Sequence, residues 1–167
     1  MGAGKSAVAR LLGERMGTLV ADLDAMIEAE EGASVAELFE GAGEPYFRRR
    51  ESELLTRALS AGARVIACGG GVVLDPARRE LLRTRCHVVW LEVSPAEAAS
   101  RVGEGAPGRP LLRGGAPETR LAAVLAARAP LYAEVAAIRI ATDGLSAAQV
   151  AAQVHEALSR AAGAPPP

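Results

Sequence analysis

The first six residues, MGAGKS, match the second half of a phosphate-binding loop, G-x-x-x-x-G-K-[ST]. Gly4, Lys5 and Ser6 occupy the last three positions of that pattern. In such a loop, backbone N–H groups at a helix start bind phosphate, the lysine reaches the terminal phosphates, and the hydroxyl binds Mg²⁺. The segment Gly2-Ala3-Gly4-Lys5-Ser6 therefore predicts a site for a nucleotide and Mg²⁺. A glycine-rich helix start without a nucleotide is the simpler alternative.

Lys5 is the only lysine among the 19 basic residues of the chain. A general bias toward arginine explains most of this composition. A lysine that remains under such a bias indicates a position where a compact ammonium fits and a planar guanidinium does not. A phosphate loop is such a position, because its lysine reaches the β- and γ-phosphates through a narrow space.

Two acids, Asp22 and Asp24, follow the apolar run TLVAD at 18–22. We interpret this run as a buried strand, in which residues two apart share a face, so both carboxylates would point into one cleft. Ligands of open α/β sheets bind beyond the carboxyl ends of the strands. One acid could bind Mg²⁺ or its water shell, and the other could hold an acceptor hydroxyl. The alternative is an acidic helix start capped by Asp24.

Three glycines, 69–71, follow a second apolar run, and they would let a substrate lie directly against the backbone. A flexible turn is the alternative. In the helical segment FRRRESE, 47–53, successive arginines point in different directions, so at most one or two face a cleft. Arg48 is the candidate, because Glu51 three residues later can hold it in place, whereas Arg49 or Arg50 belongs to a solvated charge run.

Two further arginines stand in distinctive surroundings. Arg109 belongs to the Gly- and Pro-rich segment 103–117, which we predict to be a mobile lid whose arginine closes over ATP and stabilises charge on the transferring phosphate. Arg128, in RAPLY at 128–132, precedes a proline within a helical pattern. A kinked helix with an exposed arginine is the alternative reading of that second motif.

The elements that position these residues alternate along the chain. Apolar runs predict strands at 18–22, 64–68, 87–93 and 137–141, and helical patterns lie between and after them. Such alternation predicts an α/β domain with a parallel sheet covered on both faces. We expect one domain over residues 1–160 and a disordered tail over 161–167.

The composition excludes several classes of partner. The net charge is −1 and only 3% of residues are aromatic, which disfavours binding to nucleic acid or to an anionic membrane. Apolar runs are shorter than the roughly 18–20 residues of a membrane span. The two cysteines, Cys68 and Cys86, are expected to be buried free thiols, which fits the cytoplasm.

Taken together, these motifs resemble the shikimate kinase family, within the nucleoside-monophosphate-kinase-like P-loop proteins, over nearly the whole chain. The motifs that carry the resemblance are, in order, GAGKS, DLD at 22–24, SVAELFEGAGEPYFRRRE at 34–51, GGG at 69–71, RPLL at 109–112 and RAPLY at 128–132. The resemblance implies a three-layer α/β/α fold with a five-stranded parallel sheet in the family. It also implies transfer of the γ-phosphoryl group of ATP to the 3-hydroxyl of shikimate, by a monomer.

The resemblance further implies a role for each matching residue. The nucleotide would contact Gly2, Ala3, Gly4, Lys5, Ser6, Ala7, Arg101 and Arg109. Shikimate would contact Asp24, Arg48, Arg128, Gly70, Gly71, Phe39 and Phe47. Ser6 and Asp22 would bind Mg²⁺, and Lys5, Asp24 and Arg109 would be the catalytic groups, with Asp24 positioning the hydroxyl or acting as its base.

The sequence departs from the family pattern in three places. Ala7 stands where a threonine is usual, and Ala67 and Cys68 precede the glycines where a serine or threonine often holds the metal's water. Both losses would weaken nucleotide or Mg²⁺ binding without abolishing it. The chain also begins inside the loop motif, so we expect Met1 to be an internal methionine, preceded by roughly ten residues that form a central first strand and carry the first loop glycine.

Two other functions stay open from the residues alone. Another small-molecule kinase of the same group, such as a gluconate kinase, would differ at Asp24, Arg48 and Arg128. A non-catalytic P-loop module would bind nucleotide without turnover. A GTPase is disfavoured, because guanine recognition by an N-K-x-D motif needs a second lysine.

Overall fold

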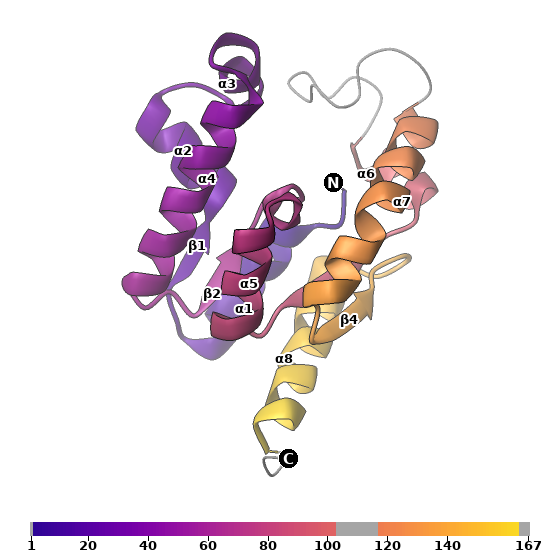
Figure 1. Cartoon of the computed structure of the whole chain (residues 1–167). Helices are drawn as coiled ribbons and strands as arrows, with labels where there is room; N and C mark the ends of the chain where they lie inside the picture. Colours follow the sequence, from indigo (N-terminus) through magenta and orange to yellow (C-terminus); the bar gives the residue numbers. More distant parts are fainter. Residues whose placement is uncertain (1, 103–116, 164–167) are drawn as a thin grey trace.

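The computed structural model describes residues 2–102 and 117–163, which form alternating helices and short strands (Figure 1). The first half contains α1 (Lys5–Met16), β1 (Val20–Asp22), α2 (Leu23–Glu31), α3 (Val35–Gly41), α4 (Gly43–Ser60) and β2 (Val65–Ala67). The second half contains the 3₁₀ helix η1 (Val72–Leu74), α5 (Pro76–Arg85), β3 (Val89–Glu92), α6 (Pro95–Val102), α7 (Pro117–Val135), β4 (Ile138–Ala141) and α8 (Ala147–Gly163).

All strand pairs among the described residues are parallel, as the alternating pattern predicts. β1 pairs with β2, with Val20 opposite Val65, and β3 pairs with β4, with Val89 opposite Ile138. The four strands therefore form two separate two-stranded sheets, and no ladder joins β2 to β3.

Two hydrophobic clusters lie on opposite faces of β2, which shows the three-layer architecture. Val65 and Ala67 pack with α1 and α8, while Ile66 between them packs with the cluster of α2, α4 and α5. Alternate residues of a strand point to opposite faces, so this short strand contributes to both clusters. The α1–α8 cluster also includes Val89 and Leu91 of β3, and it joins the two strand pairs in one core.

The expectation that Asp22 and Asp24 share one face of a strand is wrong. β1 ends at Asp22, which is the N-cap of α2 and accepts a hydrogen bond from the Ala25 N–H at 3.3 Å. That cap starts the helix at Leu23, so Asp24 lies in the first helical turn. The two acids remain neighbours at the carboxyl end of β1, but the helix start brings them together and strand alternation does not.

Other helix boundaries follow the sequence signals. Ser34 and Glu37 form a reciprocal capping box at the start of α3, and Asp75 caps α5 immediately before Pro76. α8 continues to Gly163, past the boundary expected at 160. Within the described residues, no helix is both long and apolar enough to cross a membrane.

Candidate functional site

The glycine-rich start of α1 has the backbone of an anion site. Gly2 and Gly4 both have left-handed φ angles, of 74° and 77°, which favour glycine. Gly4 is the N-cap of α1, no side chain caps this helix, and its first turn contains no acidic residue. The other described helix starts in the first half use Asp22 or Ser34 as caps or have an acid in the first turn. The first amides of α1 are thus suited to a negatively charged ligand.

Gly2 also abuts α6, since a Cβ there would lie 2.8 Å from the backbone of Ala98. Arg101 of α6 lies against the same loop. Its guanidinium donates to the carbonyl of Thr142 at 2.6 Å, to the Thr142 hydroxyl at 3.1 Å and to the Gly2 carbonyl at 3.4 Å. Arg101 thus fastens the phosphate loop to the end of β4, and its predicted contact with adenine stays a prediction.

Asp24 is a half-buried carboxylate beside this loop. Its Oδ1 is buried and has no hydrogen-bond partner among the described residues. Burial raises the pKa of Asp24 above its ordinary value of 3.8, while Lys5 and Arg48 nearby oppose that rise. The charge of Lys5 thus acts on the Asp24 carboxylate, so the predicted phosphate-binding lysine and the predicted acceptor-binding acid belong to the same part of the molecule.

Each glycine of the 69–71 run lies against a different part of the site. A Cβ at Gly69 would lie 2.6 Å from Glu51 Oε1 and 3.1 Å from Asp24 Oδ1. A Cβ at Gly70 would lie 3.1 Å from the Tyr132 hydroxyl, and one at Gly71 would overlap the guanidinium of Arg48. The run was predicted to let a substrate approach the backbone, and in the structure five side chains of the site approach it, those of Asp24, Arg48, Glu51, Arg128 and Tyr132.

Arg48 is the one of the three successive arginines that faces the glycines. It donates to Glu51 Oε2 through Nη1 at 2.8 Å and to Glu44 Oε1 through Nε at 3.1 Å. Its Cζ also lies 5.7 Å from the ring centroid of Phe39 and 5.2 Å from that of Phe47. The two rings, 4.8 Å apart, form an apolar wall under a cation.

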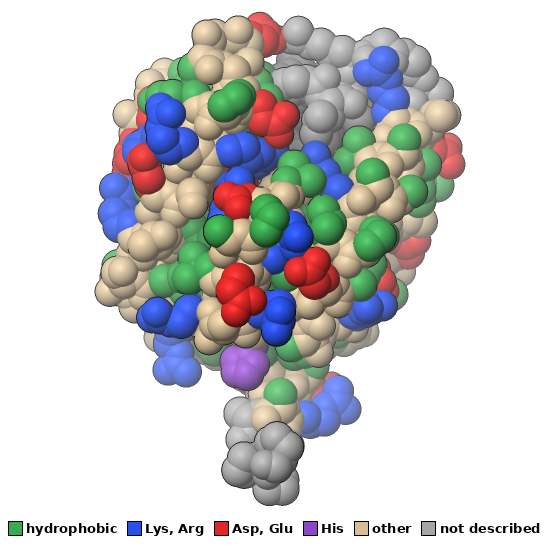
Figure 2. Space-filling view, in the orientation of Figure 1, with side chains coloured by type: hydrophobic (Ala, Val, Ile, Leu, Met, Phe, Trp, Pro, Cys, Tyr) green, Lys and Arg blue, Asp and Glu red, His purple; other side chains and the backbone are tan. Residues whose placement is uncertain are grey.

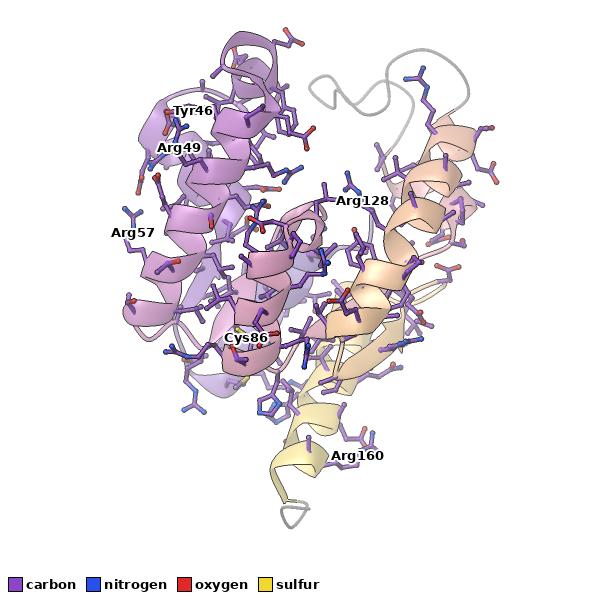
Figure 3. All side chains as sticks on the ribbon, in the orientation of Figure 1. Tyr46, Arg49, Arg57, Cys86, Arg128 and Arg160 are labelled. Carbon is purple, nitrogen blue, oxygen red and sulfur yellow. The ribbon has the colours of Figure 1, made fainter. Side chains whose placement is uncertain are left out.

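The neighbouring arginines lie elsewhere, as predicted. Arg49 stacks on Tyr46, on the side of α4 that faces away from α7 (Figure 3). Arg50 belongs to an ion-pair cluster with Glu30, Glu31 and Glu53 that joins α4 to α2.

Arg128 approaches the glycines from the opposite helix. It lies on the side of α7 that faces α4 and α5 (Figure 3), and it donates to the Gly70 carbonyl at 3.1 Å. Tyr132, one turn later, donates to the same carbonyl at 2.6 Å. The alternative of an exposed arginine is thus wrong, because Arg128 is half-buried, and α7 continues through Pro130 to Val135.

Ser6 and Asp22 are the residues predicted to hold Mg²⁺, and they fit a metal that is bound partly by phosphate. No group of three or more His, Cys, Asp or Glu side chains in the described part of the chain could hold a metal. Mg²⁺ is commonly held by one or two protein oxygens together with substrate phosphates and water. The exposed Ser6 hydroxyl on α1 and the Asp22 carboxylate at the end of β1 supply oxygens of that kind.

Two residues of this site were not singled out from the sequence. Tyr132 belongs to the quoted RAPLY motif, but its hydroxyl was given no role. Arg78 of α5 donates to Glu51 Oε2 at 3.0 Å and to the Arg48 carbonyl at 3.1 Å. In the sequence, only its position three residues after the cap Asp75 distinguishes Arg78 from Arg79. The sequence therefore gave little indication that Arg78 belongs to the site.

Other predicted features lie apart from these contacts. Arg109 and most of the segment 103–117 lie outside the described residues. A cavity of about 470 Å³ between α7 and the β3–β4 pair is lined mainly by apolar side chains and includes none of the predicted site residues. Cys68 and Cys86 are free thiols, and burial raises the pKa of Cys68 to about 12, so this thiol is not reactive.

The fold and these contacts define a class of protein. A parallel α/β domain places an uncapped, glycine-rich helix start beside a carboxylate and two arginines, which is the arrangement of a P-loop kinase that acts on a small acid. The shikimate kinase family profile matches residues 1–159.

Individual relatives agree with the profile. Shikimate kinase from Symbiobacterium thermophilum is 46% identical over 159 residues, covering 95% of this chain and 91% of the relative. The enzyme from Moorella thermoacetica is 45% identical over 158 residues, covering 95% and 90%. Shikimate kinase from Acinetobacter baumannii, solved in complex with shikimate, matches with a TM-score of 0.92 at 36% identity, over 98% of this chain and 91% of that one. The chain belongs to the shikimate kinase family.

Proposed function

We propose that this chain transfers the γ-phosphoryl group of ATP to the 3-hydroxyl of shikimate. Family membership supports the reaction, and one observation carries the assignment of residues. The unpartnered Oδ1 of Asp24 lies beside the same glycine run that Arg48 and Arg128 contact, and the charge of Lys5 acts on the Asp24 carboxylate. An acid that can accept a hydrogen bond from a hydroxyl, two arginines that can bind a carboxylate and a lysine that can bind phosphate thus belong to one site.

Each residue then has a role that its chemistry supports. Arg48 and Arg128 bind the shikimate carboxylate, since guanidinium groups pair with carboxylates through two parallel hydrogen bonds. Asp24 accepts a hydrogen bond from the attacking hydroxyl and, with a raised pKa, is better suited to take up its proton than an ordinary aspartate. Phe39 and Phe47 form the apolar wall, and the backbone at Gly70 and Gly71 lines the acceptor ring.

The nucleotide side of the site belongs to α1. The backbone from Gly2 to Ala7 surrounds the phosphates, and Lys5 neutralises charge on the terminal ones. When bound, ATP supplies the phosphoryl group and Mg²⁺, held by Ser6 and Asp22, offsets the negative charge of the phosphates. Arg101 would contact adenine, and Arg109 would act over the transferring phosphate.

We further propose that the chain acts as a cytoplasmic monomer on this small acid. Two free thiols fit a reducing compartment. Basic and acidic side chains are interspersed on the face shown in Figure 2, without one extended patch of a single sign.

A coupled ADP-release assay tests the function directly. With MgATP present, we expect shikimate to stimulate ADP release and gluconate to leave it at the background rate. Nucleotide binding with no release in the presence of either acceptor would contradict the proposal and favour a binding module. Mass spectrometry of the product, with one phosphate on the shikimate ring, identifies the reaction independently of the coupling enzymes.

A further inference from the structure

The carboxylate of Glu51 is shared by two arginines from different helices. Glu51 is fully buried, and its Oε2 accepts from Arg48 Nη1 at 2.8 Å and from Arg78 Nη1 at 3.0 Å. Arg48 and Glu51 both belong to α4, whereas Arg78 belongs to α5. Arg78 also donates to the backbone carbonyl of Arg48 at 3.1 Å, so it contacts both members of the α4 pair.

Charge balance shows what the second arginine changes. A buried Arg48–Glu51 pair alone is neutral, so it attracts a further buried anion less strongly than a pair with excess positive charge would. With Arg78, which is only 7% exposed at its side chain, the buried trio carries a net charge of +1. Glu44 and Asp75 also pair with Arg48 and Arg78, at 3.1 and 3.4 Å, but both carboxylates are about half exposed, so water screens their charge. A substrate carboxylate would bring that trio to neutrality.

The hydrogen bonds of the Arg48 guanidinium also indicate that Arg78 favours the binding of an anionic substrate. Nε and Nη1 of Arg48 are engaged by Glu44 and Glu51, while Nη2 lies where a Cβ of Gly71 would be. Glu51 thus turns the remaining edge of the Arg48 guanidinium toward the glycine run. Arg78 holds Glu51 and the Arg48 carbonyl at once, which fixes the carboxylate that orients Arg48.

We propose that Arg78 is a positioning residue for acceptor binding: it neutralises Glu51 so that Arg48 keeps its charge and orientation for an anionic substrate. This inference rests on the proposed function, because it assumes that Arg48 binds the shikimate carboxylate. Arg78 itself does not touch substrate. Its effect is expected in the KM for the acid and not in the chemical step.

The test compares Arg78→Met with Arg79→Met in the full chain. Arg79, the next residue of α5, forms its own tertiary ion pair with Glu134 of α7 and donates to the Val73 carbonyl, but it does not contact Glu51 or Arg48. We expect Arg78→Met to raise the KM for shikimate about tenfold or more, because it leaves a buried charge with one partner fewer, with kcat and the KM for ATP within about twofold. Arg79→Met should leave the KM for shikimate near that of the parent chain.

Two more variants separate charge compensation from general loosening of α5. Arg78→Lys retains the charge and should restore most of the affinity for shikimate. In the Glu51→Gln background, Arg78→Met should cost much less than in the parent chain, because no buried carboxylate is left to neutralise. Equal costs in both backgrounds, or an equal KM increase from Arg79→Met, would overturn the proposal.

The outcomes also separate this inference from the proposed function. A parent chain that releases no ADP with shikimate contradicts the function itself. A parent chain that is active, combined with an unchanged KM in Arg78→Met, contradicts only the role of Arg78. Should Arg78→Met fail to fold, two other comparisons test the role of Arg78. The KM for shikimate of the double variant Glu51→Gln/Arg78→Met is compared with that of Glu51→Gln, and the KM of Arg78→Lys is compared with that of the parent chain.

Discussion

The guanidinium of Arg48 lies in the space that a side chain at Gly71 would fill. Glycine is required at this position by close approach, because the φ angle of Gly71 is −95° and suits any residue. The absence of a Cβ at one residue therefore decides where the charge of the other can lie.

Gly71→Ala should displace Arg48 and weaken acceptor binding. We expect the KM for shikimate to rise at least about tenfold, since a misplaced binding group can cost up to 10²-fold. Gly41→Ala is the matched control, because Gly41 is helical, has no positive φ and has open space where a Cβ would be. A similar loss of acceptor binding in both variants would contradict the proposed contact.

Arg48→Ala should have a larger effect on the acceptor than on the nucleotide. We expect the KM for shikimate to rise about 10²-fold, because the variant removes a charge-assisted pair and leaves Glu51 with one fewer counterion. Binding of MgATP should change little. Arg49→Ala, which removes an arginine stacked on Tyr46, should leave both constants unchanged, and steady-state kinetics with each substrate varied in turn measures the difference.

Asp24→Asn should mainly reduce kcat. Asparagine keeps the size of the side chain but removes the proton acceptor, so we expect a loss of about 10²–10⁴-fold at saturating substrates. Nucleotide affinity, measured by titration calorimetry, should remain within a few-fold of the parent chain. A variant that retains more than a tenth of the parent kcat would show that Asp24 only positions the hydroxyl.

The raised pKa of Asp24 also makes a prediction about stability and pH. Burial favours the protonated carboxyl in the folded chain, so between 3.8 and its higher folded pKa the folded state binds more protons than the unfolded state. The contribution of Asp24 to stability is therefore present at low pH and is lost as pH rises through the folded pKa. In urea melts, the stability of Asp24→Asn relative to the parent should increase with pH over this interval, and a pH-independent difference would contradict it.

Tyr132→Phe tests the second donor to the Gly70 carbonyl. Arg128 continues to donate to that oxygen, so the loss in free energy of unfolding should be only about 0.5–1.5 kcal/mol. We also expect the KM for shikimate to rise a few-fold. Tyr46→Phe is the control, because it removes a hydrogen bond of the same length to Glu31 and should change stability without changing that KM.

Much of this site could be predicted from the sequence, for reasons that individual residues make clear. The phosphate loop, the glycine run and the choice of Arg48 over its neighbours rest on local spacing, which the fold preserves. Asp24 was expected on a strand and lies in the first turn of α2 instead, because either acid of the DLD segment could cap this helix and the sequence does not say which one does. The capping bond of Asp22 decided it.

The role of Arg78 was not predictable in the same way. Arg78 and Arg79 are adjacent, equally charged residues of one helix, and only packing sends the first to Glu51 and the second to Glu134. Local sequence spacing does not show which residues of α4 and α5 contact each other. Arg109 was expected to lie over the phosphates. It is outside the described residues, so this expectation stays a prediction.

The position of the two arginines on different helices has one further consequence for the acceptor. Arg48 belongs to α4 and Arg128 to α7, and Phe47 of the first helix and Val135 of the second pack into the same hydrophobic cluster (Figure 1). An acid bound by both arginines would link these two helices through its carboxylate. It would add to the packing that already joins them, and hydrogen exchange in α4 and α7 should slow together when the acid is added.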